Sequence, residues 1–579
     1  MRLRFLLLLI IASALAWAED LPAEVQQRFA KRALATMEQR VALAGELKGF
    51  GEAGFNALIK LLDDKAWAVR VAAVEALAAG YPEACEKNLD RLAGERSMRM
   101  RCSVVFLAAQ VRKEHAIDLI QRLAGDRTDA GAIARLAAVE VAPVLFAAGE
   151  GKPAEKKTID LLANLVAKDT DLRVRNGAAK ALCTVAQRSP TALRALTEAT
   201  TALPEDLAGT VVEELLAAKF PEATLVRGFA RQLASAPAFE ARCIAADALG
   251  RIGGPEATEA LLTGLPQCTG VKYKDARAAI WDSLGMIAPT DAKVIARIEQ
   301  AADSIANGDR WMGVRLAAAW ALMRIGSKQA IPYATMWISR NEPEDMCWLL
   351  QRYTGQRFTT RAEWEKWWLG AKKDWQHQAA FTNEKSSEID FYDVKDVVSN
   401  VVFVLDTSGS MTDSRAIPPR KGEKPVNRPK IEAARTELWR TLRDLQPGTR
   451  FSVISFSETV IQWSNGPLRA TWRNKWLMRE EMDRHSARGG TNSHAGIAAG
   501  LVSAGVEAMF FLSDGQPTAG FIRDPDLLNA DVVERNQEVP RPCRIHALSF
   551  YMDKAEEKIA KSFMERLAKL NGGVYKVVE

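Results

Sequence analysis

The sequence predicts an α-helical solenoid followed by a C-terminal α/β domain with a doubly wound sheet. Across roughly the first 340 of its 579 residues, a phrase rich in Val, Arg, Ala and Leu recurs at intervals in the thirties. Across the last 180 residues, short apolar runs alternate with helical stretches, which is the pattern of a sheet covered by helices. A Trp-rich segment lies between the two regions.

The N-terminus has the pattern of a secretory signal peptide at residues 1–18. Arg2 and Arg4 precede an apolar run from Phe5 to about Leu15, and Ala16-Trp17-Ala18 provides a small-residue cleavage site. The apolar run is too short to span a bilayer comfortably, and no later stretch is long and apolar enough. We therefore expect an exported protein, periplasmic or extracellular, with no membrane span after signal cleavage; an uncleaved anchor is the alternative.

The repeated phrase predicts stacked helix pairs over residues 19–345. Four clear copies contain Arg70, Arg175, Arg242 and Arg315, and weaker copies surround Arg101, Arg135 and Arg277. Small Ala residues let neighbouring helices approach closely, while Leu and Val fill the shared core. The phrase resembles the second helix of HEAT repeats.

The recurrent Arg is expected near the start of each second helix, bonded to Asp or backbone groups of an adjacent repeat. Asp64, Asp171 and Asp309 stand a few residues before Arg70, Arg175 and Arg315 and are the expected acids. The alternative is an exposed anion-binding stripe. Such a solenoid offers an extended surface to a protein or a polysaccharide.

Residues 346–396 are expected to cap the last repeat and lead into the α/β domain. Trp364, Trp367, Trp368 and Trp375 share one helical face. We expect these rings to seal the apolar end of the solenoid; a carbohydrate-binding platform is the alternative. Residues 376–390 are predicted to be a linker.

The most informative motif begins with the apolar run Val401-Val-Phe-Val-Leu, which ends at Asp406 and is followed by Ser408 and Ser410. Thr491 lies in a Gly-rich stretch, and Asp514 ends a second apolar run. Ligands of doubly wound sheets lie at the carboxyl ends of the strands, where both Asp residues fall. Carboxylates and hydroxyls suit Mg²⁺ or Mn²⁺. The alternative is a turn with capping Asp and Ser side chains.

The order D-x-S-x-S, then Thr, then Asp resembles the metal-ion-dependent adhesion site of von Willebrand factor type A (VWA) domains. The resemblance covers residues 397–579. It implies Mg²⁺ or Mn²⁺ as cofactor, with Asp406, Ser408, Ser410, Thr491 and Asp514 holding the ion directly or through waters. It also implies a protein partner that presents a carboxylate. With the segment from Tyr353 to Trp368, the chain resembles exported bacterial proteins that join HEAT-like repeats to a C-terminal VWA domain.

One stretch departs from that family. Residues 412–429 separate the metal motif from the next helix, and prolines and charges there argue against packed structure. Counting through Lys430, six basic residues face Asp413 and Glu423, a net charge of +4. We expect either a mobile basic rim that attracts acidic partners or a solvated insertion without a role.

Composition and motifs exclude several functions. A net charge of +6 over 579 residues, with no basic stripe, argues against nucleic-acid binding. There is no Walker loop for ATP, no G-x-S-x-G elbow and no H-E-x-x-H motif. Seven Cys is an odd number, and those in Ala-rich runs predict mostly free buried thiols with at most one or two disulfides.

These observations predict a non-enzymatic, metal-dependent binding protein. The metal site would hold an acidic group of a protein partner, and the solenoid would be a second docking surface. The alternative is a structural scaffold of the cell envelope in which the metal serves stability.

Overall fold

The computed structural model describes residues 21–578 apart from residues 129–130, 190, 193–204, 218–221, 307–308, 339–343, 377–386, 418–424, 465, 504 and 551–556. The described residues form two compact units, which we treat separately. The first is residues 1–199 with 530–542, and the second is residues 200–529 with 543–579. The predicted signal peptide lies outside the described residues.

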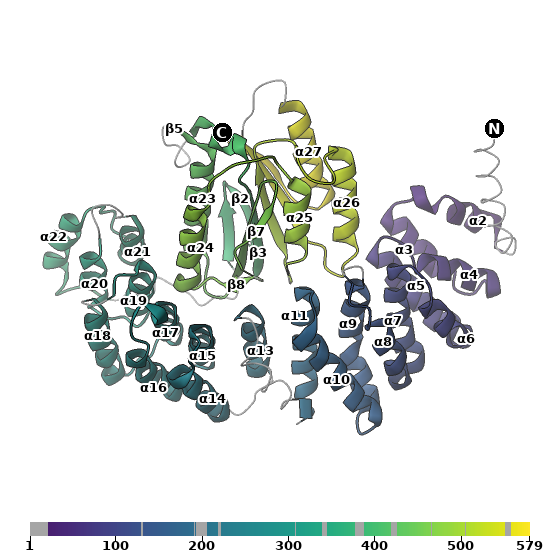
Figure 1. Cartoon of the computed structure of the whole chain (residues 1–579), viewed down its shortest axis with the longest axis horizontal. Coiled ribbons are helices and arrows are strands. Elements are labelled where there is room, and N and C mark those ends of the chain that lie inside the picture. The colour runs from purple at the N-terminus through teal and green to yellow at the C-terminus, as the bar shows by residue number, and fades with distance from the viewer. Residues whose placement is uncertain are drawn as a thin grey trace. The chain divides into compact units, whose positions relative to one another are not determined.

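The first unit is a two-layer stack of helices (Figure 1). One layer contains α3, α5, α7, α9 and α11, each in contact with the next, and α4, α6, α8 and α10 pack on it. The helices are α2 (Ala23–Ala30), α3 (Met37–Glu46), α4 (Gly51–Leu61), α5 (Trp67–Gly80), α6 (Pro82–Ala93), α7 (Met98–Arg112), α8 (Ile117–Leu123), α9 (Ala132–Gly149), α10 (Pro153–Lys168) and α11 (Leu172–Ala186).

One described helix, α9, is long and apolar enough to cross a membrane by length and composition. Its most apolar window is 61% buried within the protein, as is usual for a core helix of a stacked repeat.

The recurrent Arg has a fixed place in the stack. Each of the seven predicted copies is the fourth residue of its helix, from Arg70 in α5 to Arg315 in α19 (Met312–Arg324). Its guanidinium donates to backbone carbonyls just before the helix, as from Arg70 to Asp64 and from Arg315 to Asp309. The prediction that the Arg lies at the start of a helix is confirmed. These backbone bonds lie within its own repeat, whereas Asp bonds such as that of Arg135 to Asp169 reach the adjacent repeat, as predicted.

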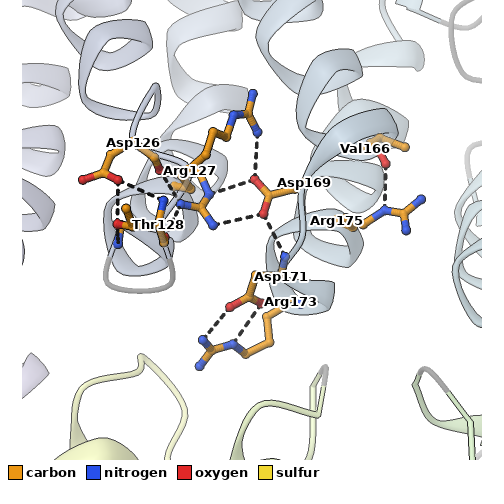
Figure 2. Close-up of polar contacts among 10 residues, drawn as sticks. Asp126, Arg127, Thr128, Val166, Asp169, Asp171, Arg173 and Arg175 are labelled. Atoms are coloured by element: carbon orange, nitrogen blue, oxygen red, sulfur yellow. Dashed lines mark hydrogen bonds and ion pairs between the residues drawn. The ribbon is translucent and has the colours of Figure 1, made fainter.

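The Asp residues that join consecutive repeats use one carboxylate oxygen for their own loop and reach back to an earlier Arg. Asp169 accepts the N–H of Asp171 at 3.0 Å and two bonds from Arg135, at 2.8 and 3.1 Å (Figure 2). Asp309 accepts the N–H of Trp311 and a 2.7 Å bond from Arg277.

In one repeat the predicted acid is wrong. The carboxylate of Asp171 pairs with Arg173 and caps the N-terminus of α11, while the guanidinium of Arg175 donates to the carbonyl of Val166 (Figure 2). Asp169 links the repeats there instead, because its carboxylate accepts two bonds from Arg135 of the preceding repeat. The side chain of Arg135 is fully buried, which argues against an exposed anion-binding stripe.

The second unit begins with further helix pairs. The helix α17 contacts α15 and α19 in one layer, and α14 and α16 pack beside them. The helices are α13 (Glu205–Ala217), α14 (Glu222–Ser235), α15 (Phe239–Ile252), α16 (Gly254–Gly264), α17 (Lys274–Ile287), α18 (Ala292–Ala306), α19, α20 (Ala330–Met336), α21 (Glu344–Thr354) and α22 (Arg361–Ala371).

The Trp-rich segment packs mainly against itself and the last helices. Trp364 of α22 is fully buried and meets the rings of Phe358 and Trp367 edge-on, while Trp375 packs on Tyr353 of α21. This packing is what a cap on the last helices requires and favours it over a sugar platform.

The rest of the second unit is a mixed α/β region whose main sheet has the strand order β11-β10-β9-β3-β6-β7. The pairings from β11 to β6 are parallel, and β7 and β8 pair antiparallel with β6. The strands are β3 (Asn400–Asp406), β6 (Arg450–Phe456), β7 (Val460–Gln462), β8 (Leu468–Arg469), β9 (Ala508–Ser513), β10 (Arg544–Phe550) and β11 (Tyr575–Val578).

Helices flank this sheet (Figure 1): α23 (Lys430–Asp444), α24 (Trp472–Arg484), α25 (Ser493–Leu501) and α27 (Glu557–Leu570). A further helix, α26 (Pro525–Gln537), is divided between the two units. All seven residues of the central strand β3 are buried, as expected for a strand covered on both faces. The apolar run of β3 therefore lies in the core of the α/β region, and the candidate ligand Asp406 ends this strand.

Two small hairpins add to the predicted elements. β1 (Ser387–Phe391) pairs with β2 (Val394–Val398) through a turn in which Tyr392 and Asp393 both have positive φ. β4 (Ser414–Ile417) pairs with β5 (Val426–Pro429), so the ends of the basic stretch 412–429 are ordered. The expectation that this stretch has no packed structure is wrong at those ends, because the chain returns on itself; residues 418–424 lie outside the described residues.

All seven Cys residues are buried and none forms a disulfide, in agreement with the predicted thiols. Burial raises the pKa of Cys102 and Cys543 to about 12, so these thiols stay protonated.

Two buried carboxylates of the helical part, those of Asp282 and Asp345, accept hydrogen bonds from α24 and α23. Asp282 of α17 accepts the N–H groups of Trp472 and Arg473 at 3.0 and 2.9 Å, which caps α24 from a distant part of the chain. Asp345 of α21 accepts bonds from Trp439 at 2.8 Å and from Arg443 at 3.1 Å. The α/β region thus takes part of its helix capping from the solenoid.

Removal of the buried acid Asp169 should destabilise the first unit strongly. In Asp169→Ala the guanidinium of Arg135 stays buried without its carboxylate, which costs about 3–5 kcal/mol. Urea denaturation measures the loss. Asp118→Ala, which removes an exposed pair with Lys157, should cost less than about 1 kcal/mol. Equal losses in the two variants would contradict the importance of the buried pair.

Stability should also depend on pH through Asp282. Burial raises the pKa of Asp282 to about 7, so the native state keeps a proton that the unfolded chain has lost. Its contribution is complete below about pH 4 and is lost as the pH rises through 7. Relative to Asp282→Asn, the wild type should therefore lose stability between those values, by at most about 1.4 kcal/mol per pH unit.

Denaturation curves at several pH values measure this difference. Burial lowers the pKa of the neighbouring Lys475 to about 7, so its contribution to stability changes between about pH 7 and 10, above the range in which Asp282 acts. A constant difference between wild type and variant across the range would contradict the raised pKa of Asp282.

Candidate metal centre

The ends of two neighbouring strands bring the acidic ligand candidates together. β3 and β9 are adjacent and parallel, paired from Val401–Ala508 to Leu405–Leu512. Asp406 is the last residue of β3, and Asp514 directly follows β9. Parallel strands end at the same edge of a sheet, so both carboxylates lie there. Asp406 is fully buried and Asp514 is 3% exposed.

Asp406 organises the loop that follows it. One carboxylate oxygen accepts the backbone N–H of Ser408 at 2.7 Å, and the other accepts the hydroxyl of Ser513. The chain then turns through a short 3₁₀ helix, Gly409–Thr412, which places the second serine beside the first. The hydroxyl oxygens of Ser408 and Ser410 are 3.2 Å apart, and Ser410 donates to Asp514 at 2.8 Å.

Thr491 reaches this edge through its loop. The N–H of Gly409 donates to Gly489 at 2.9 Å, and that of Arg488 donates to Thr407 at 2.8 Å. The backbone N–H of Thr491 donates to the hydroxyl of Thr518, whose own N–H returns to the carbonyl of Thr491. Hydrogen bonds thus connect Asp406, Ser408, Ser410 and Asp514 to one another, and backbone bonds tie the loop of Thr491 to both neighbouring loops.

A lysine that the sequence analysis assigned to the basic stretch belongs to this cluster. Lys430, the first residue of α23, places its Nζ 2.7 Å from Asp514 Oδ2 and 3.4 Å from the carbonyl of Ser410. Its side chain is only 4% exposed. The sequence gives no signal for this contact, since Lys430 follows Ser410 by twenty positions and the stretch between them has a net positive charge.

The cluster is short of positive charge. Burial, together with the nearby carboxylate of Asp514, raises the pKa of Asp406 to about 6. Lys430 supplies one positive charge against two buried carboxylates. The described residues contain no group of three or more His, Cys, Asp or Glu with metal-site geometry. Two carboxylates with several hydroxyls are instead a hard-oxygen set, which fits a small dication such as Mg²⁺.

The loop after Asp514 displays an exposed aromatic ring. Phe521 is 97% exposed, although the backbone two and three residues earlier is bonded to Thr491. Gly520 has φ +94°, and a Cβ there would lie 2.2 Å from the Asn492 side chain, so the loop packs tightly against the start of α25. A fixed loop therefore holds a large apolar side chain in solvent beside the candidate metal centre.

Comparisons with known proteins agree with the helical prediction. A model of the HEAT repeat matches residues 55–79, and a model of the PBS lyase HEAT-like repeat matches residues 241–265 and 314–333. The helical region contains HEAT repeats. The matched segments fall on α4–α5, α15–α16 and α19–α20, which are consecutive helices of the stack.

Partial relatives are found among inter-alpha-trypsin inhibitor heavy chains. The chain is 29% identical over 187 residues to heavy chain 4 from Mus musculus, which covers 30% of this chain and 17% of that protein. It is 29% identical over 148 residues to heavy chain H6 from Homo sapiens, which covers 23% of this chain and 10% of that protein. The chain spans less than a fifth of the length of either.

Among solved structures, BatB from Bacteroides thetaiotaomicron is similar to 31% of this chain, over 91% of its own length. The sequence identity is 15% and the TM-score is 0.23. The PilB minor pilin from Streptococcus sanguinis is similar to 33% of this chain and 57% of its own, also with 15% identity and a TM-score of 0.23.

Proposed function

We propose that residues 397–579 are a VWA-type domain that binds Mg²⁺ or Mn²⁺ and, through it, an acidic group of a protein partner. The convergence of Asp406, Ser408, Ser410 and Asp514 at one buried edge of a parallel sheet is the observation that carries the proposal. Partial likeness to inter-alpha-trypsin inhibitor heavy chains supports an interaction role.

The role of the site is recognition rather than catalysis. Asp406 and Asp514 are each engaged by hydrogen-bond donors, Ser513 and Lys430 among them, and neither is positioned as a general base toward open solvent. Neutral hydroxyls leave much of the charge of a dication uncancelled, so a carboxylate from outside is a favourable additional ligand. We place the protein outside the cytoplasm on the basis of its N-terminal sequence.

Phe521 favours a protein partner over a free small anion. Rigid aromatic side chains that are exposed in the free protein are typical anchors of protein interfaces. The HEAT repeats offer the same partner a second, extended surface. The recognition element is therefore a carboxylate with an apolar group beside it.

Metal binding is tested by calorimetric titration of Mg²⁺ and Mn²⁺ into the full chain, because α24 is capped by Asp282 and an isolated C-terminal fragment lacks that cap. We expect saturable binding that Asp406→Ala abolishes, since the metal loses a carboxylate and the Ser408 loop its anchor. Absence of binding to the wild-type protein would contradict the proposal.

A double variant separates recognition from the alternative, an envelope scaffold stabilised by its metal. Ser408→Ala with Ser410→Ala removes two hydroxyl ligands and leaves the carboxylates in place. Loss of partner binding with an unchanged melting temperature supports recognition. A large fall in melting temperature that matches the effect of metal removal from the wild type supports the scaffold.

The partner interface should depend on Phe521. We expect Phe521→Ala to weaken partner binding by about tenfold or more, equivalent to about 1.4 kcal/mol, without a change in metal affinity. Titration of partner into variant and wild-type protein in Mg²⁺ buffer measures the loss. Leu34→Ala, at an exposed leucine of the first unit, is the matched control. An unchanged partner affinity in Phe521→Ala would show that this loop is not part of the interface.

A further inference from the structure

Lys430 occupies a position that the fold alone does not favour. It is the first residue of α23, where the partial positive charge of the helix terminus opposes a cation. It is also 3% exposed, and burial of an ammonium group is costly unless it is paired. The side chain nevertheless enters the cluster and contacts Asp514 and Ser410. The buried ammonium of Lys430 is therefore stabilised by its ion pair with the carboxylate of Asp514.

The two oxygens of Asp514 are divided between two partners. Oδ1 accepts the hydroxyl of Ser410, one of the metal-ligand candidates, and Oδ2 accepts the ammonium of Lys430. The ammonium of Lys430 and the hydroxyl of Ser410 therefore use different oxygens of Asp514, although Lys430 also lies 3.4 Å from the carbonyl of Ser410. It can remain in place when a cation joins the hydroxyls.

This placement sets the charge of the whole cluster. The buried carboxylates of Asp406 and Asp514 together carry two negative charges, and Lys430 reduces this to one. A third carboxylate, that of Asp413, lies 3.9 Å from the Lys430 ammonium but is exposed to solvent, which screens its charge. When a dication binds, the cluster becomes positive by one charge, whereas the same cluster without the lysine would be neutral. The groups are buried, so these charges are only weakly screened by water and salt.

We infer that Lys430 is a built-in cation of the metal centre: it holds Asp514 in place when no metal is bound, weakens the affinity for the dication, and leaves the loaded site positive so that it selects an anionic ligand. The inference rests on the proposed function and adds to it the residue that makes the site prefer carboxylates. Lys430 acts through Asp514 and is a positioning residue.

The test measures Mg²⁺ affinity of the full chain by calorimetry, with and without acetate as a minimal carboxylate probe. In Lys430→Met we expect about tenfold tighter Mg²⁺ binding, because a like charge has been removed from beside the ion. Acetate should tighten Mg²⁺ binding to the wild type and have little effect on the variant, whose loaded site is neutral.

Two control variants keep the charge argument separate from general effects. Lys430→Arg retains the cation and should resemble the wild type in both measurements. Lys561→Met removes an exposed lysine of α27 and should change neither. If Lys430→Met is unstable without metal, Mg²⁺ should raise its melting temperature by more than it raises that of the wild type.

The outcomes distinguish this inference from the proposed function. Equal Mg²⁺ affinity in Lys430→Met and the wild type, or an equal acetate effect, overturns the role of Lys430 and leaves the metal site standing. Binding to Lys430→Met alone overturns the inference and the proposed function, because the wild-type site then never holds the ion that both require. If neither the wild type nor Lys430→Met binds Mg²⁺, the inference and the proposed function are both overturned. A loss of melting temperature in Lys430→Met that Mg²⁺ does not reduce means that the lysine is merely structural.

Discussion

A carboxylate that leaves water needs a cation or several N–H donors, and this chain buries carboxylates where its parts are joined. Asp169 links consecutive repeats through Arg135, and Asp345 links the last solenoid helices to α23 through Trp439 and Arg443. Because an unpaired buried charge costs far more than a paired one contributes, each junction is specific: only the correct partner satisfies it.

The candidate metal centre meets the same requirement incompletely. Two buried carboxylates, Asp406 and Asp514, have one ammonium between them, that of Lys430. The buried carboxylate of Asp345, by contrast, accepts bonds from Trp439 and from the guanidinium of Arg443. A cluster that retains negative charge and several hydroxyls can still bind a cation from solution. This difference in pairing with cations separates the junction at Asp345 from the candidate metal centre.

Much of this arrangement was predictable from local sequence. The helix predicted at residues 430–444 is found at those bounds, and the apolar runs before Asp406 and Asp514 are adjacent parallel strands. Such elements are set by short-range periodicity, which a single sequence reveals. The β1–β2 hairpin and α24 were not predicted: the hairpin turn uses Tyr392 and Asp393 rather than glycine, and α24 is capped by a residue far away in the chain.

The sequence by itself determined the repeats, the apolar strands that lead to Asp406 and Asp514, and the five ligand candidates, because spacing and residue type are local properties. Tertiary structure alone decided which charges meet. Asp169 rather than Asp171 joins its repeat, and Lys430 belongs to the cluster of Asp514 rather than to a solvated loop. The physical reason is that buried charges choose partners by distance and desolvation in three dimensions, and neither quantity can be read along the chain.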